Sequence, residues 1–258
     1  MTTYYLAIDG GGTKTDVVLF DQEGMMHRRV IGESTNPNAL TKEQIKTRFH
    51  SIFIELFSDL EITTIKACFA GMSGADHPEL NARIQSAIAE GCPLPLEKLT
   101  VENDAVNALW SGTEGDQGLV IIAGTGSILY GRNQKGESFR IAGWGHLVGD
   151  EGSGYAIGRD AIRHALAAFD GVEEKGMLYS LILEHFKLSQ MSDIIPLIYD
   201  QPKPVLASLV PIVAKAADKG DHVALNILEK ASNELARLIE AGRSRFPSSD
   251  VPIILAGG

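Results

Sequence analysis

The sequence has few cysteines, no excess of basic residues and no long apolar run. Its two cysteines, Cys68 and Cys92, fit no metal-binding spacing and indicate a reducing compartment without structural disulfides. The net charge of −10 argues against nucleic acid or an anionic membrane as the main partner. No charged-then-apolar leader opens the chain, and no apolar run approaches the roughly 18 residues of a membrane-spanning helix. We therefore expect a cytoplasmic protein.

The bulk composition is ordinary for a globular protein. Of the 258 residues, 44 % are hydrophobic and 22 % are charged. At this length a chain buries enough surface to fold without a disulfide or a structural metal. Because the net charge is negative, an anionic substrate would need local basic side chains or backbone N–H donors.

A glycine-rich stretch, Asp9–Lys14, lies between two apolar runs near the start of the chain. Residues 4–9 and 15–20 are typical of strands, so the glycines form a tight turn between them. Glycine lets the backbone approach a ligand closely, and successive N–H groups in such a turn suit a phosphate. Asp9, at the end of a strand, could hold a divalent cation or a water bound to one. The alternative is an ordinary glycine-rich hairpin.

Two common phosphate-binding motifs are absent from this stretch. A P-loop needs glycine directly before Lys-Ser/Thr, but Thr13 precedes Lys14. The dinucleotide-binding fingerprint leads into a helix, whereas the β-branched and apolar residues 15–20 predict another strand. A phosphate site here therefore requires a different architecture.

The first half of the chain predicts the element order βββ-α-β-α-β-α. Thr41 and Gln44 have the spacing of a capping box, and the apolar positions that follow keep helical spacing. This order predicts a mixed sheet with helices on both faces. The remaining expected elements are strands at 25–31, 65–70 and 99–102 and helices at 41–57, at 78–90 and from about 105.

The second half begins like the first. A shift of 112 positions places Gly12-Thr13 on Gly124-Thr125 and Arg28 on Arg140. Both copies show a strand, a glycine turn, a strand, a polar turn ending in glycine, and a third strand. Internal repeats fix architecture, so we predict two domains on one plan, residues 1–114 and 115–258, with a phosphate-type turn in each.

The rest of the chain is expected to be mostly helical. Helices should occupy residues 155–246, with breaks near 170–171, 201–204 and 219–221. A last strand at 252–255 leads into Ala256-Gly257-Gly258. Because a pair of glycines caps nothing, we expect the sequence to be an interrupted chain.

The candidate site residues lie in loops that follow predicted strands, because ligands bind where strand ends converge. Phosphoryl transfer to a hydroxyl needs a carboxylate to accept its proton, and Asp104 closes a strand between the two phosphate turns. Helix capping is the alternative role for Asp104, and packing is the alternative for Trp144 and His146. Asn36 and Ser73 could equally be turn residues, and Asp150 a loop carboxylate that accepts from backbone N–H groups.

Taken together, these motifs resemble the sugar-kinase, Hsp70 and actin superfamily. More closely, they resemble the BadF/BadG/BcrA/BcrD ATPase-like family and its N-acetylglucosamine kinase branch. The resemblance implies an α/β fold of two tandem domains of ribonuclease H-like (actin-like ATPase) type, each a mixed sheet flanked by helices, with a ligand cleft between them. The residues that carry it are Asp9–Thr15, Ser73-Gly74, Asn103–Ala105, Ala123–Ser127, Gly143–His146 and Gly149–Ser153.

The same resemblance implies a role for each matching position. Asp104 is the implied catalytic base. Asp9 is the Mg²⁺ site expected from its place at the end of a strand, through water. The implied ATP-binding residues are Gly10, Gly11, Gly12, Thr13, Lys14, Gly124, Thr125, Gly126, Gly257 and Gly258. The implied sugar-binding residues are Asn36, Ser73, Asp104, Gly143, Trp144, Gly145, His146 and Asp150. ATP and Mg²⁺ are the expected cofactors, and a homodimer is the expected assembly.

The expected activity is ATP-dependent phosphorylation of N-acetylglucosamine at its 6-hydroxyl, with a glucosamine kinase as the close alternative. A third member of the family, the ATPase activator of 2-hydroxyacyl-CoA dehydratases, needs cysteines for an iron–sulfur cluster. Cys68 and Cys92 both precede the second phosphate turn, which is the wrong region for that cluster. A sugar-responsive protein without catalysis is disfavoured because Asp104 and both phosphate turns are present.

Overall fold

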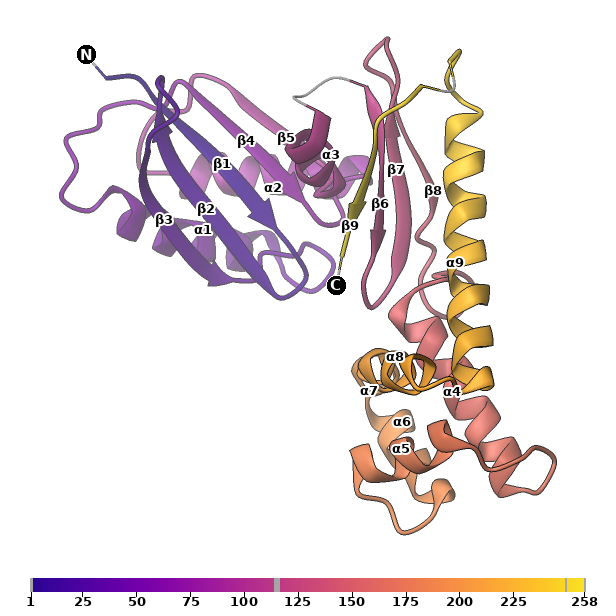
Figure 1. Cartoon of the computed structure of the whole chain (residues 1–258). Coiled ribbons are helices and arrows are strands. Elements are labelled where there is room, and N and C mark those ends of the chain that lie inside the picture. The colour runs from indigo at the N-terminus through magenta and orange to yellow at the C-terminus, as the bar shows by residue number, and fades with distance from the viewer. Residues whose placement is uncertain (1, 114–116, 249, 258) are drawn as a thin grey trace. The chain divides into compact units, whose positions relative to one another are not determined.

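In the computed structural model the chain forms two compact units, which divide between Trp110 and Ser111. The structure describes residues 2–113, 117–248 and 250–257. The boundary predicted between residues 114 and 115 falls outside the described residues and stays a prediction. Each unit has its own sheet, whose strands are labelled in Figure 1.

The first unit contains a five-stranded mixed sheet in the order β3-β2-β1-β4-β5. Strand β1 is antiparallel to β2 and parallel to β4, which in turn is parallel to β5. The predicted element order and mixed sheet are confirmed. The elements are β1 (Tyr4–Gly10), β2 (Lys14–Asp21), β3 (Met26–Glu33), α1 (Lys42–Phe57), β4 (Ala67–Met72), α2 (Pro78–Gly91), β5 (Leu99–Glu102) and α3 (Ala105–Thr113).

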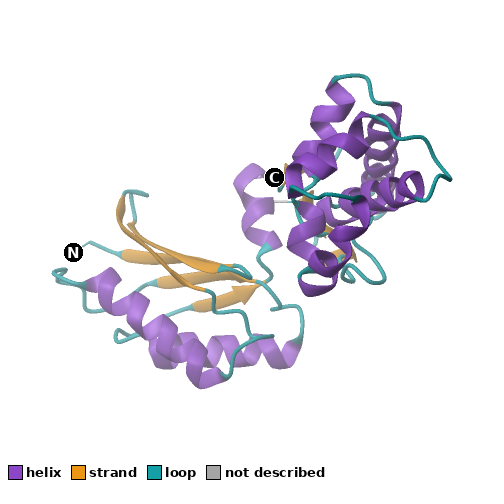
Figure 2. Cartoon of the chain, turned by 90° about the horizontal axis from the view of Figure 1, so that it is seen from below, coloured by secondary structure: helices purple, strands orange, loops and turns teal. Residues whose placement is uncertain are grey.

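Helices α1 and α2 cover one face of this sheet, as Figure 2 shows. The capping box of α1 is confirmed, since Thr41 and Gln44 bond each other reciprocally. The apolar positions of α1 are buried in one core with the inward residues of β1 and β2. On the opposite face, Trp110 of α3 packs against Phe69 of β4, and the centroids of the two rings lie 4.5 Å apart. The prediction of helices on both faces is thus confirmed.

Strand β4 differs from its predicted range of 65–70. Ile65 makes only an isolated bridge to Leu96, whereas the strand continues to Met72. The extension arises because Gly71 and Met72 pair with the last residues of β1. Pairing of this kind is tertiary and leaves no mark in the local sequence.

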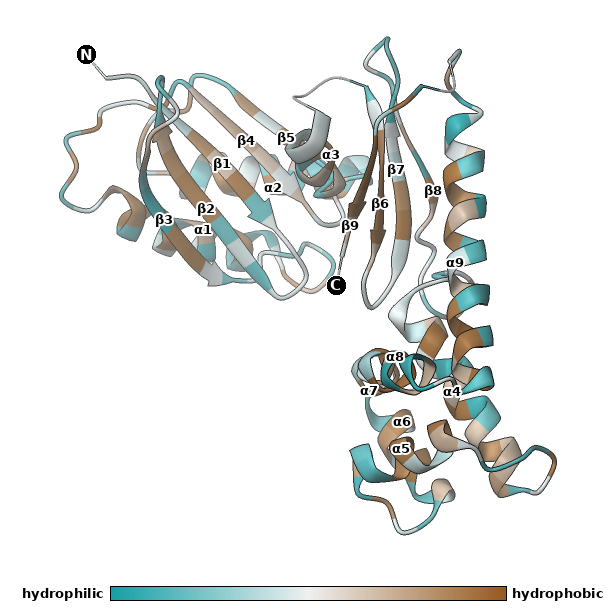
Figure 3. Ribbon diagram, viewed as in Figure 1, coloured by the Kyte–Doolittle hydropathy of each residue, from teal (hydrophilic) through white to brown (hydrophobic). Residues whose placement is uncertain are grey.

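The second unit contains a four-stranded sheet in the order β8-β7-β6-β9, with β6 and β9 parallel. Its strands are β6 (Gly118–Ala123), β7 (Ser127–Arg132), β8 (Ser138–Ala142) and β9 (Ile253–Ala256). The long helix α9 (His222–Arg243) contacts β6, β7 and β8. Figure 3 shows apolar residues along these strands and alternating apolar and hydrophilic residues around α9. This alternation lets one side of α9 cover the sheet while the other faces solvent.

The chain is mostly helical from Gly154 to Arg243, as predicted, and these helices share an apolar core. The predicted break at residues 201–204 is wrong in part, because only Gln201 separates two helices. Pro202 and Pro204 lie in the first turn of a helix, where a missing N–H costs no hydrogen bond. The helices are α4 (Gly154–Phe169), α5 (Met177–Phe186), α6 (Ile195–Asp200), α7 (Pro202–Ala207) and α8 (Val210–Asp218), with a 3₁₀ turn at Met191–Ile194.

No helix among the described residues is long and apolar enough to cross a membrane. The two cysteines are free thiols.

Candidate functional site

In the first unit, the predicted site residues lie at one edge of the sheet. The parallel strands β1, β4 and β5 end at this edge, where β2 begins and β3 ends. Four loops leave from it, at residues 10–14, 34–38, 73–76 and 103–104. The fold therefore brings the first glycine turn, Asn36, Ser73 and Asp104 to the same edge, although they are far apart in sequence.

The first glycine turn is closed by a hydrogen bond from the N–H of Gly11 to the carbonyl of Lys14, 3.0 Å long. Within the described chain, the N–H groups of Gly12 and Thr13 donate to no protein acceptor. A β-carbon on Gly10 would meet the end of the buried Met72 side chain, which would then have to shift. The turn thus presents two free backbone donors, as a phosphate requires.

The loop that carries Asn36 is fastened to this turn. The hydroxyl of Ser34 donates to the carbonyl of Gly11 (2.9 Å) and accepts from the N–H of Asn36 (3.2 Å). Beneath them, the buried hydroxyls of Thr15 and Thr35 lie 2.8 Å apart. These bonds hold the glycine turn and the Asn36 loop together as one piece.

Asp104 stands at the start of α3, where helix capping is the alternative to a role as catalytic base. The Oδ1 atom of Asn103 accepts a hydrogen bond of 2.9 Å from the N–H of Ala105. The Nδ2 group of Asn103 donates to Asp76 at 2.8 Å, which ties this turn to the loop after β4. In that loop, the N–H of Ser73 donates to the carbonyl of Gly10 at 2.8 Å. Asn103 therefore accepts from the N–H of Ala105 at the start of α3, and the same N–H favours the ionised form of Asp104.

Burial raises the pKa of Asp104 to about 6, and the nearby charges of Asp9 and Asp76 add to the effect. The N–H groups of Ala105 and of Asp104 itself act in the opposite direction and favour the carboxylate. A group with this pKa is ionised at neutral pH and is still basic enough to accept a proton. Those are the properties that a general base needs.

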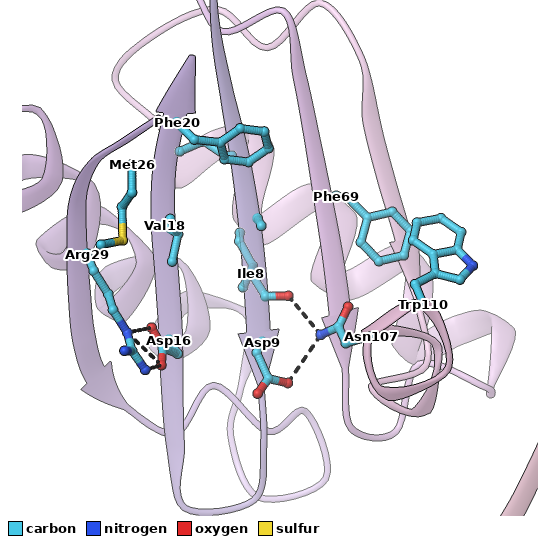
Figure 4. A pocket seen from close by; sticks show the side chains of 12 residues that line it. Ile8, Asp9, Asp16, Val18, Phe20, Met26, Arg29, Phe69, Asn107 and Trp110 are labelled. Carbon is cyan, nitrogen blue, oxygen red and sulfur yellow. Dashed lines mark hydrogen bonds and ion pairs between the residues drawn. The ribbon is translucent and has the colours of Figure 1, made fainter. Parts of the chain in front are cut away.

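Asp9 is held by a residue that sequence reasoning missed. Asn107, one turn into α3, donates from Nδ2 to the Oδ1 of Asp9 (3.2 Å) and to the carbonyl of Ile8 (3.3 Å). Figure 4 shows these two bonds. Asn107 lies over Gly71, where any side chain would collide with it. Its position three residues after Asp104, on the same side of a helix, was the available signal.

A cavity of about 560 Å³ lies on the sheet face opposite α1 and α2. Figure 4 shows its apolar wall and its polar end, where Asp9 with Asn107 lies beside the ion pair of Asp16 with Arg29 on the paired strand. Of the predicted site residues, only Asp9 lines it. The cavity therefore adjoins the loop cluster without forming part of it.

In the second unit, the turn Gly124–Gly126 is fastened to the start of α4. The carbonyl of Gly124 accepts from the N–H of Gly154 (2.7 Å), and that of Thr125 from the N–H of Tyr155 (3.2 Å). The N–H groups of Thr125 and Gly126 make no hydrogen bond to another described residue. Like the first turn, this one presents two free backbone donors.

Asp150, a predicted sugar ligand, lies against this turn. It is buried, has a positive φ of 60°, and places Oδ2 2.9 Å from the point where a β-carbon on Gly126 would stand. Gly126 is therefore required for close approach of the carboxylate. The fold brings together a predicted phosphate residue and a predicted sugar residue within one unit.

The loop Gly143–His146 leaves the edge of the second sheet through two left-handed residues, Ala142 (φ 63°) and Gly143 (φ 71°). Trp144 is 65 % exposed, so it is not a core aromatic. His146 packs edge-on against Tyr155, with ring centroids 5.0 Å apart. The exposed indole is thus available to a ligand.

Gly257 follows β9 with a φ of 116°, and a side chain there would collide with the carbonyl of Ala123. It thus lies beside the strand that leads into the second glycine turn. Gly258, the last predicted ATP ligand, lies outside the described residues.

The motifs that occupy these edges recur in a known family. The sequence profile of the BadF/BadG/BcrA/BcrD ATPase family matches residues 6–258. The chain belongs to this family.

Two curated relatives cover nearly the whole chain. An N-acetylmuramic acid/N-acetylglucosamine kinase of Clostridium acetobutylicum is 39 % identical over 99 % of this chain and 85 % of its own length. An N-acetyl-D-glucosamine kinase of Dictyostelium discoideum is 35 % identical over 98 % of this chain and 84 % of its own length. The family resemblance drawn from the motifs is therefore confirmed.

A solved structure has a similar fold. A crystal structure from Chromobacterium violaceum, assigned as an N-acetylglucosamine kinase, has a TM-score of 0.81 with 24 % identity, covering 99 % of this chain and 87 % of that one. At this identity the likeness concerns the fold alone. It confirms the predicted class, an α/β fold of two mixed sheets flanked by helices.

Proposed function

We propose that the protein is an ATP-dependent kinase that phosphorylates N-acetylglucosamine at its 6-hydroxyl. The observation that carries this proposal is the half-buried carboxylate of Asp104, with a pKa raised to about 6, at the edge where a glycine turn offers free N–H groups. N-acetylglucosamine is the acceptor that the two curated relatives share by name.

Asp104 accepts the proton of the sugar hydroxyl as that oxygen attacks the terminal phosphorus of ATP, the bond from this phosphorus to the bridging oxygen breaks, and ADP leaves. General-base assistance of this kind contributes about 10²–10⁴ in rate. The free N–H groups of Gly12 and Thr13 bind phosphate oxygens and stabilise the charge that develops on them. In the same unit, the side chains of Asn36 and Ser73 bind sugar hydroxyls.

The second unit supplies a matching set. The N–H groups of Thr125 and Gly126 bind phosphate, and Gly257 approaches the nucleotide. Trp144, His146 and Asp150 bind the sugar and its N-acetyl group, along with the backbone of Gly143 and Gly145. Asp150 and Gly126 are in contact, so the sugar and phosphate contacts of this unit are mechanically linked.

The residues at the end of β1 fit Mg²⁺. This ion usually binds through one or two carboxylates and keeps several waters, so a single carboxylate such as Asp9, fixed by Asn107, is sufficient. When bound, Mg²⁺ neutralises phosphate charge. The chain's own contribution is to hold the Asp9 carboxylate in a fixed orientation.

Glucosamine is the close alternative acceptor, and it differs only at the amine. A function as dehydratase activator is disfavoured, because the two cysteines that would have to bind an iron–sulfur cluster favour the protonated thiol. Burial raises the pKa of the Cys68 thiol to about 12 and also raises the pKa of Cys92, so both thiolates are unfavourable. A colourless purified protein supports the kinase, and a brown one with cluster absorbance would support the activator.

The test is a coupled ADP-release assay with ATP and Mg²⁺ over a panel of hexoses, hexosamines and N-acetylhexosamines. We expect the largest kcat/KM with N-acetylglucosamine and phosphate on its 6-oxygen by NMR. A larger kcat/KM with glucosamine would mean that the protein is a glucosamine kinase. Absence of sugar-dependent ADP release would refute the kinase function. A cytoplasmic location and a homodimer remain predictions, tested by fractionation and by light scattering.

A further inference from the structure

The side-chain amide of Asn36 has a fixed orientation. Its Oδ1 atom accepts a hydrogen bond of 2.9 Å from the N–H of Asn38, which forms an Asx turn. An amide side chain carries its acceptor on one arm and its two donors on the other, and a backbone N–H pairs only with the acceptor. The Nδ2 group of Asn36 is therefore on the arm that does not bind Asn38.

The loop uses every other polar group of Asn36. The backbone N–H donates to the hydroxyl of Ser34 (3.2 Å), and the backbone carbonyl accepts from the N–H of Ala39 (3.2 Å). Within the part of the chain that the structure describes, Nδ2 donates to no protein acceptor. Because Asn36 is partly exposed, its two side-chain N–H donors are held in place by the loop and remain available to a ligand.

These donors lie beside the first glycine turn. Nδ2 is 3.9 Å from the point where a β-carbon on Gly12 would stand. The hydroxyl of Ser34, which accepts from the N–H of Asn36, also donates to the carbonyl of Gly11 at 2.9 Å. One hydroxyl thus joins the amide to the turn, and the donors of Asn36 lie next to the free N–H groups of Gly12 and Thr13.

The chemistry of the free groups favours a phosphoryl group over a sugar hydroxyl as their partner. A hydroxyl both donates and accepts, so it is satisfied best by a neighbour that offers a donor and an acceptor. The acceptor of Asn36 is already used by Asn38, which leaves donors alone. Phosphoryl oxygens only accept and carry negative charge, and hydrogen bonds to an ionised acceptor are about twice as strong as neutral ones. Donors without a free acceptor therefore match a phosphoryl group.

We propose that one side-chain N–H of Asn36 donates to the phosphoryl group in transfer, while the other keeps the proposed contact with the sugar. In this step the sugar oxygen bonds to phosphorus, Asp104 takes the hydroxyl proton, the bond from phosphorus to the bridging oxygen breaks, and ADP leaves. The charge of the transferred group is spread over its three peripheral oxygens. Asn36 stabilises that charge together with the N–H groups of Gly12 and Thr13, so it is a catalytic residue as well as a sugar ligand.

This inference rests on the proposed kinase function, and Asn36→Ser tests it. Serine keeps an oxygen that accepts from the N–H of Asn38 and removes the amide donors without adding charge. Loss of one donor to a developing anion costs about 10²–10³ in rate, so kcat with N-acetylglucosamine falls by that factor. Calorimetry without nucleotide gives the dissociation constant of the sugar, which rises by no more than about tenfold, the value of one neutral hydrogen bond.

A mimic of the phosphoryl group in transfer separates this contact from a structural effect. Aluminium fluoride, added with ADP, Mg²⁺ and N-acetylglucosamine, supplies a planar anion in place of that group. We expect Asn36→Ser to weaken binding of the fluoride about 10²–10³-fold and to leave the dissociation constant of ADP alone within a few-fold. A structural disturbance would weaken ADP alone and the fluoride complex equally, and that result would overturn the inference.

Asn133→Ser is the matched control. Asn133 forms the same turn in the β7–β8 hairpin, where its Oδ1 atom accepts from the N–H of Lys135 at 2.9 Å. This variant leaves kcat and the dissociation constants of sugar and ADP unchanged.

Asn36→Asp provides a second test that preserves the turn. It keeps the acceptor for Asn38 and places a negative charge where the donors were, so its kcat is lower than that of Asn36→Ser. A normal kcat in Asn36→Asp would overturn the inference. A higher sugar dissociation constant with a normal kcat in Asn36→Ser would also overturn it, because Asn36 would then bind the sugar alone. A wild-type protein without sugar-dependent ADP release would refute the kinase function itself, and the inference with it.

Discussion

The carboxylate of Asp150 lies against the backbone of Gly126, with Oδ2 2.9 Å from the place of a β-carbon that Gly126 lacks. One residue belongs to the proposed sugar loop and the other to the proposed phosphate turn. This close approach places the two loops of the second unit side by side. Changes at either residue should therefore affect both ligands.

Gly126→Ala tests this contact. The added methyl group forces the Asp150 carboxylate or the turn to shift, and overpacking of this kind costs about 1–3 kcal/mol of stability. We expect lower stability in urea denaturation and a higher KM for both ATP and the sugar. In the Asp150→Ala background the same substitution should cost less stability, because the methyl group then has room. Equal costs in both backgrounds would show that the contact does not constrain the turn.

The positions of these residues were easier to predict than their contacts. Helix α1 was found because its apolar positions repeat with helical spacing and Thr41 opens it. Strand β4 was predicted two residues early because its pairing with β1 is a tertiary interaction. Pro202 and Pro204 were interpreted as a break, although proline is favoured in a first helical turn.

The candidate site shows the same limit. Asp104 and both glycine turns are visible as motifs, because strand ends followed by glycine or acid are local patterns. Asn103 has no local pattern of its own beyond its place before Asp104, and its hydrogen bond to Asp76 joins two loops that are distant in sequence. Asn107 carries no motif, and its role appears only when α3 is laid against β1 and β4.

Asp104 should make the folded protein less stable at neutral pH. Its folded pKa, about 6, lies above the ordinary value of 3.8, so the native state keeps a proton that the unfolded state loses between those values. Stability from this group is therefore present below pH 3.8 and is lost as pH rises to 6. Asp104→Asn should raise the free energy of unfolding by on the order of 1–3 kcal/mol at pH 7.5.

The same measurement at pH 3.5 should show almost no difference between Asp104→Asn and the wild type, because the carboxyl is then protonated in the folded state and mostly protonated in the unfolded state. Denaturant titrations at the two pH values provide the check. An Asp104→Asn variant that is less stable at pH 7.5 would show that the ionised carboxylate is stabilised by its surroundings.

Asp76 should raise the pKa of Asp104 and hold the side chain of Asn103 in place. Asp76→Asn keeps an acceptor oxygen for Asn103 but removes a negative charge, so the pKa of Asp104 falls. The acid limb of the pH–kcat/KM profile should then move to lower pH, with Asp9 as the remaining charge that raises it. Asp76→Ala also removes the hydrogen bond and leaves the buried amide of Asn103 without its acceptor. We expect it to lose about 1–3 kcal/mol of stability as well. If the acid limb does not move in Asp76→Asn, Asp76 does not influence the pKa of Asp104.

Asn107 should tune the proposed Mg²⁺ site through Asp9. Loss of a residue that orients a metal ligand typically weakens metal affinity about 10–100-fold, so Asn107→Ala should raise the Mg²⁺ concentration for half-maximal ADP release by that factor. The measurement is initial rate against MgCl₂ at fixed nucleotide. Asn81→Ala is the control, since Asn81 donates to the carbonyls of Ala75 and Val101 and has no contact with Asp9. It should lower stability without changing the Mg²⁺ requirement, and a similar shift in both variants would remove Asn107 from the site.

The central claim, that Asp104 accepts the proton of the sugar hydroxyl, is tested most directly by Asp104→Asn. Calorimetry gives the dissociation constant for N-acetylglucosamine, and ADP release gives kcat. We predict binding within a few-fold of the wild type and a kcat lower by about 10²–10⁴. A variant that binds the sugar and retains near-normal kcat would contradict the account.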